Sequence, residues 1–187
     1  MLLVSNFEAG RILTLRGYYM HTFQPYPIEL YEANPFTLIG EQWYTITAEK
    51  DGKVNTMTAS WGTLGSLWGK YVAVVYVRES RLTHEFLDAC DYFSITNYAK
   101  GNRSALKYLG SVSGRDEDKI AGARFHVNYD SGVPFIDEGT FSLICKKISR
   151  TEITPDQFID PNIESDWYKD GDYHTMYVGE IIKALAR

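Results

Sequence analysis

The stretch WYTITAEKDGKVNTMTASW, residues 43–61, decides the fold class of this chain. Its first part is rich in β-branched and aromatic residues, which favour a strand. Asp51-Gly52 then gives a strong signal for a tight hairpin turn, and small polar residues alternate with larger ones from Val54 to Trp61. The stretch therefore predicts a β-hairpin.

Several other segments have strand character. The continuous apolar run YVAVVYV, residues 71–77, is typical of a strand that is buried on both faces at the centre of a sheet. Runs of aromatic and β-branched residues predict further strands at 92–96 and 141–148, and a long closing strand at 173–185. The chain thus contains many strands distributed over most of its length.

Two short helices interrupt these strands. The spacing of apolar residues predicts one helix over 82–90, with Thr83 as its N-terminal cap. A second helix is predicted after Asn102, and Gly110 is expected to end it. Because short strands and small helices do not follow a repeated strand–helix–strand order, the chain is predicted to be mainly β, a barrel or sandwich with a few short helices.

A single domain is expected over residues 1–187. The length suits one domain, and no repeat, low-complexity tract or Gly/Ser linker divides the chain. Residues 1–35 differ in texture, because tyrosines and phenylalanines are interspersed with prolines that disfavour helix. We expect this aromatic and proline-rich N-terminal extension to wrap the domain or a partner subunit.

Composition and charge argue against several functions. The formal net charge is -5 and basic residues form no long run, which disfavours nucleic-acid binding. No apolar stretch is long enough for a membrane span and the N-terminus lacks a signal-peptide pattern, so a cytoplasmic protein without a membrane partner is expected. The distant Cys90 and Cys145, and histidines without ligand spacing, predict no disulfide and no metal site.

Two clusters of residues have the chemistry of a ligand site. From Asn55 to Gly62, small hydroxylated side chains would let backbone groups approach a planar heterocycle, although an edge strand with solvated Thr and Ser explains this cluster more simply. Arg78, Arg81 and Thr83 lie where a strand ends and a helix begins, which suits a phosphate dianion. The competing interpretation pairs both arginines with surface carboxylates.

A third cluster, in a predicted turn, contains Ser113, Arg115 and Lys119. Gly114 permits a left-handed turn and either cation could reach an anion, but a solvated turn explains the same residues. His174 could donate to a ligand or shuttle a proton, or it could be structural. Because no nucleophile motif such as GxSxG is present, catalytic residues stay unassigned and a cofactor would carry the reactivity.

Taken in this order, the three clusters and the segment around His174 resemble the flavin reductase-like family of FMN-binding split barrels, which includes flavoredoxin. The resemblance covers about residues 35–185. It implies a Greek-key-type split barrel, a homodimer, and FMN bound near the dimer interface. The residues that it implies for FMN binding are Asn55, Thr56, Met57, Thr58, Ala59, Ser60, Trp61, Arg78, Arg81, Thr83, Ser113, Arg115, Lys119 and His174.

The same resemblance implies an oxidoreductase that transfers a hydride from NAD(P)H to flavin and passes electrons to free flavin or a redox protein. Catalysis would rest on positioning the nicotinamide against the flavin ring. Two alternatives stay open. One is a flavoredoxin-type FMN electron carrier without nicotinamide activity, and the other is a non-catalytic flavin-binding module.

Overall fold

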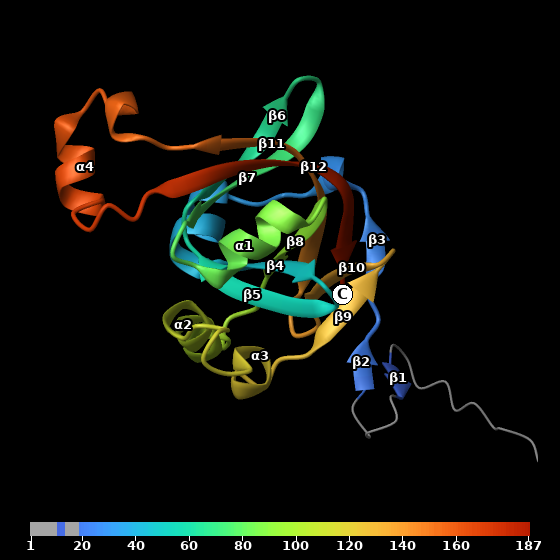
Figure 1. Ribbon diagram of the computed structural model, residues 1–187. Coiled ribbons are helices and arrows are strands. Elements are labelled where there is room, and N and C mark those ends of the chain that lie inside the picture. The colour runs from blue at the N-terminus through green and yellow to red at the C-terminus, as the bar shows by residue number, and fades with distance from the viewer. Residues whose placement is uncertain (1–10, 14–18) are drawn as a thin grey trace, which may run out of the picture.

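A computed structural model describes residues 11–13 and 19–187 (Figure 1). The predicted extension over 1–35 therefore lies partly outside the described residues. The strands are β1 (Arg11–Leu13), β2 (Tyr19–His21), β3 (Gln24–Tyr26), β4 (Tyr44–Lys50), β5 (Lys53–Ala59), β6 (Gly62–Leu67), β7 (Lys70–Arg78), β8 (Tyr92–Asn97), β9 (Val127–Asp130), β10 (Val133–Ile136), β11 (Phe141–Glu152) and β12 (His174–Ala186). The helices are α1 (Leu82–Ala89), α2 (Arg103–Ser111), α3 (Lys119–Gly122) and α4 (Pro161–Trp167), with short turns η1 (Ile28–Leu30), η2 (Thr37–Gln42) and η3 (Pro155–Gln157).

The main sheet is antiparallel and has the order β5-β4-β8-β11-β12-β7-β6, with β3 added alongside β12. Neighbours such as β4 and β8 are far apart in the sequence, so the chain crosses over in Greek-key fashion. The sheet curls around an apolar core, and the end strands β5 and β6 form no ladder with each other in the described structure (Figure 1). The predicted mainly β split barrel with a few short helices is confirmed.

The predicted hairpin consists of β4 and β5, which pair along their whole length. Asp51 and Gly52 have φ values of 51° and 72°, as a tight two-residue turn requires. Ile46 faces the core, whereas Thr47 on the other face is buried and shares a 2.9 Å hydrogen bond with the hydroxyl of Thr56. Both faces of this hairpin are therefore packed, and this packing fixes the position of β5.

Strand β7 differs from its prediction. It lies beside the end strand β6 and not at the centre of the sheet. Val75 and Val77 are fully buried, but Tyr71 is exposed and Tyr76 is only half-buried, so burial is one-sided along most of the strand. The reason is that the face carrying Tyr76 and Arg78 borders a cavity instead of a second packed layer.

The helix ends also differ from prediction. Arg81 occupies the N-cap position of α1, and the hydroxyl of Thr83 accepts a hydrogen bond from a neighbouring strand, so Thr83 is not the cap. Helix α2 does follow Asn102, but the Asn102 amide donates to the carbonyl of Ala99 and caps nothing. Gly110 lies inside α2, which continues to Ser111.

The described part of the N-terminal extension packs on the barrel. Tyr31 stacks on Phe141 with ring centroids 4.1 Å apart, and β3 pairs with β12. His21 contributes a second attachment, because its Nδ1 lies 2.7 Å from the buried carboxylate of Asp137. These contacts fit the expectation that the extension wraps the domain.

Three further properties belong to the described residues. No helix in this part of the chain is long and apolar enough to cross a membrane. Residues 11–13 and 19–187 contain no group of three or more His, Cys, Asp or Glu side chains arranged to hold a metal ion. Cys90 and Cys145 are both free thiols, the first half-buried and the second fully buried.

Candidate functional site

The ends of β5 and β7 and the start of β12 border a cavity of about 280 Å³. We call it the arginine cavity, because two arginines lie in its wall. Its lining consists of Met57, Thr58, Ala59, Ser60, Trp61, Tyr76, Arg78, Arg81, Trp167 and His174. Residues of the first two predicted clusters and His174 thus meet at one place, together with Tyr76 and Trp167, which the sequence did not single out. The third cluster contributes no residue to this lining.

Ser60 also borders two neighbouring hollows. One has a volume of about 250 Å³ and lies against α2, where Leu106 and Gly110 contribute to its wall. The other, which we call the apolar cavity, has a volume of about 520 Å³ and lies between η2 and β6. The turn from β5 to β6 therefore stands at the junction of three hollows.

Trp61 forms the tip of this turn. Its ring is 5.1 Å from Trp167, edge to face, and 5.0 Å from the imidazole of His174. The hydroxyl of Tyr44 donates a 2.6 Å hydrogen bond to the Trp61 carbonyl, which fixes the backbone. A Cβ on Gly62 would lie 2.7 Å from that same hydroxyl, so only glycine fits there without displacement.

Arg78 holds the segment that closes one side of the arginine cavity. Its Nη2 donates to the carbonyl of Trp167 and its Nη1 to the carbonyl of Asp172, both at 2.8 Å. Its guanidinium carbon also lies 5.3 Å from the ring centroid of Tyr168. The carboxylates of Asp170 and Asp172 are farther away, at 3.6 and 3.9 Å. Arg78 is therefore a clamp on residues 167–172 whose charge stays only partly balanced.

Arg81 has a more open environment. Its side chain is exposed, and its Nη1 donates a 3.0 Å hydrogen bond to the carbonyl of Gly110 near the end of α2. A guanidinium group has five donors, so this bond leaves several directed at the cavity and its surroundings. The competing interpretation, in which surface carboxylates pair with both arginines, therefore holds in part: Arg78 lies near Asp170 and Asp172, whereas Arg81 forms no ion pair in the described structure.

His174 is a buried histidine beside these cations. Its Nδ1 is 2.9 Å from the hydroxyl of Tyr168. Burial, with a smaller contribution from Arg78, lowers the pKa of His174 from 6.5 to about 4. The imidazole is therefore neutral near pH 7 and can exchange hydrogen bonds without adding charge to the site.

Three of the predicted residues lie behind the cavity wall. Asn55 and Thr83 are buried and bonded to each other, and the buried hydroxyl of Thr56 donates to the carbonyl of Ile46. These side chains connect β5 to α1 and β4. They support the strand end and do not line the arginine cavity.

The predicted turn cluster is also outside the cavity. Arg115 donates to the carbonyl of Ser80 and forms an ion pair with Glu85, and the Ser113 hydroxyl accepts from the Arg115 backbone. The ammonium of Lys119 is buried and donates to the carbonyls of Leu109 and Val112 at 3.2 Å. Burial and nearby Arg81 lower the pKa of Lys119 to about 8. These residues stabilise the region between α1 and α2.

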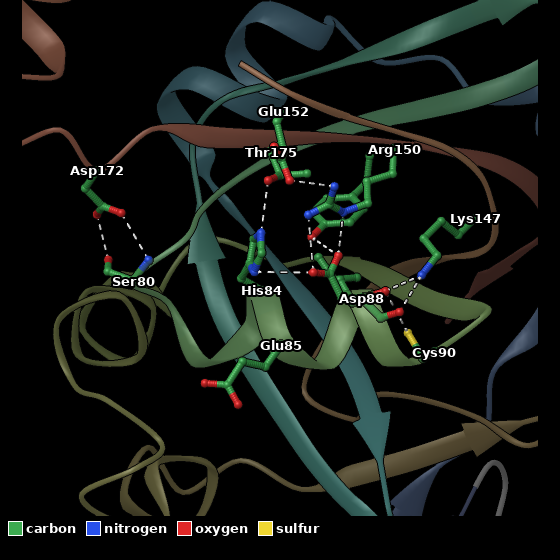
Figure 2. Close-up of polar contacts among 12 residues, drawn as sticks. Ser80, His84, Glu85, Asp88, Cys90, Lys147, Arg150, Glu152, Asp172 and Thr175 are labelled. Carbon is green, nitrogen blue, oxygen red and sulfur yellow. Dashed lines mark hydrogen bonds and ion pairs between the residues drawn. The ribbon is translucent and has the colours of Figure 1, made fainter. Parts of the chain in front are cut away.

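A polar network fixes α1 against the sheet. Figure 2 shows His84 of α1 pointing to Thr175 of β12, at 2.9 Å, and Asp88 pointing to Arg150 of β11, at 2.8 Å. At the other end of the helix, the backbone and hydroxyl of Ser80 donate to the Asp172 carboxylate. The loop that carries Arg81 is thereby held at a defined place beside the cavity.

Sequence reasoning missed two residues of the wall, Tyr76 and Trp167. Tyr76 stands two positions before Arg78 on β7, so the twofold periodicity of a strand puts both on one face and could have revealed it. Trp167 lies at the end of α4, in an acidic segment that protrudes beyond β11 and β12 (Figure 1). No pattern in the sequence indicates that this segment folds back to Trp61.

The described geometry agrees with a comparison of the sequence with known families. The model of the flavin reductase like domain matches residues 37–187, which include the whole lining of the arginine cavity. The chain belongs to the flavin reductase like family. No curated protein sequence matches this member of the family significantly.

Solved structures agree with this assignment. Flavoredoxin from Methanosarcina acetivorans is 25% identical with a TM-score of 0.63, and the alignment covers 78% of this chain and 68% of that one. An FMN-binding protein from Thermus thermophilus, solved with bound p-hydroxybenzaldehyde, is 20% identical with a TM-score of 0.62 and coverages of 88% and 82%. The NADH:FAD oxidoreductase of Streptomyces globisporus is 20% identical with a TM-score of 0.59 and coverages of 78% and 75%. Together with the family match, the FMN-binding relatives among these structures support FMN as the cofactor.

Proposed function

We propose that this member of the flavin reductase like family binds FMN in the arginine cavity and works as an NAD(P)H-dependent flavin reductase. The observation that carries the proposal is the meeting of Arg78 and Arg81 with the small-residue end of β5 in one cavity. A cavity whose wall has both guanidinium groups and small side chains suits a ligand that has a phosphate and a flat ring.

The donor set fits FMN. A phosphate dianion is bound best by guanidinium groups that offer several parallel donors, and Arg81 has most of its donors available. Thr58, Ala59 and Ser60 have short side chains, so a planar ring can come close to the backbone of β5. Trp61 provides an aromatic surface at the turn.

The residues of the site supply binding and orientation. When bound, FMN provides a ring that accepts a hydride from a nicotinamide and passes electrons to a second molecule. Trp61 and Trp167 place aromatic surface along one side of the cavity, and neutral His174 offers a hydrogen bond without a competing charge. No side chain in this wall needs to act as a nucleophile, because positioning carries the rate enhancement.

The proposal includes a homodimer, with NAD(P)H as the electron donor and free flavin or a redox protein as the acceptor. A cavity that is open beside the protruding α4 segment supports completion of the site by a second subunit. Light scattering coupled to gel filtration tests this part, because a dimer predicts twice the chain mass of 21.4 kDa.

A second function is favoured by the 25% identity with a flavoredoxin. In that case the protein keeps FMN bound and exchanges electrons with a protein donor, with little response to a nicotinamide. The two functions share the site and differ only in the electron donor.

The test is anaerobic reduction of the FMN-loaded protein. For a reductase, NADH or NADPH bleaches the flavin absorbance within seconds to minutes, and free FMN in excess is then reduced in repeated turnovers. Bleaching by dithionite but not by either nicotinamide would support the electron carrier and contradict the reductase.

A further inference from the structure

We infer that the apolar cavity between η2 and β6 binds an uncharged, planar aromatic molecule, and that this molecule is the electron acceptor of the protein. The acceptor role rests on the proposed function, because it requires flavin in the arginine cavity. The binding itself does not. The lining of the apolar cavity is Pro35, Phe36, Ile39, Gly40, Ser60, Trp61, Gly62, Thr63 and Leu64.

The apolar cavity and the arginine cavity differ in the charge of their walls. The apolar cavity has no ionisable side chain in its wall, whereas the arginine cavity has two guanidinium groups and an imidazole. A buried or half-buried anion without a cationic partner is strongly unfavourable. The pyrophosphate of a nicotinamide dinucleotide, or the phosphate of a second FMN, therefore lacks a partner here, and an uncharged ligand is selected.

Aromatic surface is available in the same wall. The side chain of Phe36 is 85% exposed, and Trp61 is 37% exposed at the boundary between the two cavities. Exposed aromatic side chains around a hollow are typical of a binding site, because their burial by a ligand is favourable. The hydroxyls of Ser60 and Thr63 add hydrogen-bond donors that suit a carbonyl oxygen on the ligand.

The location of the apolar cavity beside the arginine cavity supports the role of its ligand as electron acceptor. Ser60 and Trp61 line both cavities, so a molecule in the apolar cavity would lie on the other side of this turn from a ligand in the arginine cavity. A quinone has the required properties, since it is flat, uncharged and has two carbonyl oxygens. It becomes a hydroquinone by gaining two electrons and two protons. The two electrons and one proton leave NAD(P)H together as a hydride and reach the quinone by way of the flavin, and the second proton comes from solvent.

Two glycines allow a matched test. A Cβ on Gly40 or on Gly65 meets no atom within 4 Å, and neither residue has a positive φ. Gly40 lines the apolar cavity, whereas Gly65 lies on β6 outside it. Gly40→Leu should therefore fill the cavity without disturbing the fold, and Gly65→Leu should add the same side chain to the same region without filling it. Phe36→Ala removes an exposed ring and serves as a second variant that cannot harm the core.

The experiment titrates each protein, without FMN, with 1,4-naphthoquinone and with its 2-sulfonate, and follows tryptophan fluorescence. We expect the wild type and Gly65→Leu to bind the uncharged quinone at least about tenfold more tightly than the sulfonate. Gly40→Leu should lose quinone affinity by about tenfold or more, and Phe36→Ala by a few-fold. A parallel FMN titration should give the same affinity for all four proteins.

Different outcomes bear on different claims. Equal quinone affinity in the wild type and Gly40→Leu, or no measurable affinity in the wild type, overturns the inference. If the inference is overturned in this way, and the wild type is a dimer while Gly40→Leu is a monomer, then the second subunit occupies the cavity. Quinone binding that is lost in Gly40→Leu, together with no FMN binding, supports the cavity as a site but contradicts the proposed function.

Discussion

The side-chain amide of Asn55 on β5 donates a 2.7 Å hydrogen bond to the hydroxyl of Thr83 on α1, and both residues are buried. This bond joins the strand that lines the arginine cavity to the helix whose first turn follows Arg81. Gly114 packs against the same amide, since a Cβ there would lie 2.4 Å from Asn55 Oδ1. Residues that resemble FMN ligands in the sequence thus act in this chain as a buried connection between two parts of the site.

Loss of this connection should destabilise the fold. Asn55→Ala removes the donor and leaves a small void, and we expect a loss of about 1–3 kcal/mol in the free energy of unfolding. Thr83→Ala should have a similar effect. In the double variant the losses should be clearly less than additive, because both changes break one bond. Urea denaturation measures all four proteins, and strictly additive losses would show that the bond contributes nothing.

Arg81, at the start of α1, and Arg115, in the turn cluster, should differ in their effect on FMN binding. Arg81→Ala removes donors from the arginine cavity and should weaken FMN binding by about 10- to 100-fold, the usual effect of losing a hydrogen bond to a charged group. Arg115→Ala is the matched control, since Arg115 is engaged with Glu85 and Ser80. Fluorescence titration with FMN compares the variants, and an equal loss in both would show that the turn cluster holds the phosphate.

The clamp formed by Arg78 should control the protruding segment. Arg78→Lys keeps the charge but cannot donate to the carbonyls of Trp167 and Asp172 from one planar group. We expect faster amide hydrogen exchange across residues 161–173 and unchanged exchange in β4. An exchange pattern identical to the wild type would mean that the segment is held by other contacts.

The buried imidazole of His174 should make the fold sensitive to acid. Because its pKa in the folded protein is about 4 and that of an unfolded histidine is near 6.5, the unfolded state binds the proton more readily between these values. Stability should be unaffected above about pH 6.5 and should fall as the pH is lowered towards 4, by about 3 kcal/mol in total. His174→Gln should flatten this pH dependence. A histidine resonance of His174 that titrates near pH 6.5 by NMR would contradict it.

Local structure was predictable from the sequence because it depends on neighbouring residues. The Asp51-Gly52 turn and the strand character of 43–61 follow from backbone preferences, and the structure confirms the hairpin. The resemblance to a family also named Thr58–Trp61, Arg78, Arg81 and His174; these residues line one cavity, and their role in FMN binding stays a prediction. Their meeting depends on the strand order, which brings His174 opposite Arg78 in the β7–β12 ladder.

Longer-range packing was not predictable in the same way. Lys119 was expected to reach an anion, but its ammonium is used by the carbonyls at the end of α2, an arrangement that depends on how α3 packs. Thr83 was expected to cap α1, but the helix begins at Leu82 with Arg81 at the N-cap, and the hydroxyl of Thr83 accepts from a buried amide of another element. Trp167 joins the site through long-range contacts, with its backbone held by Arg78 of β7 and its ring against Trp61.

The most direct test of the account is isothermal titration of the purified protein, freed of bound flavin, with FMN and then with riboflavin. We predict about one FMN per chain with a dissociation constant of about 1 μM or tighter, and binding of riboflavin at least about tenfold weaker because it lacks the phosphate that the arginines recognise. Equal affinity for the two flavins, or no heat of binding with FMN, would contradict the assignment of the arginine cavity as the FMN site.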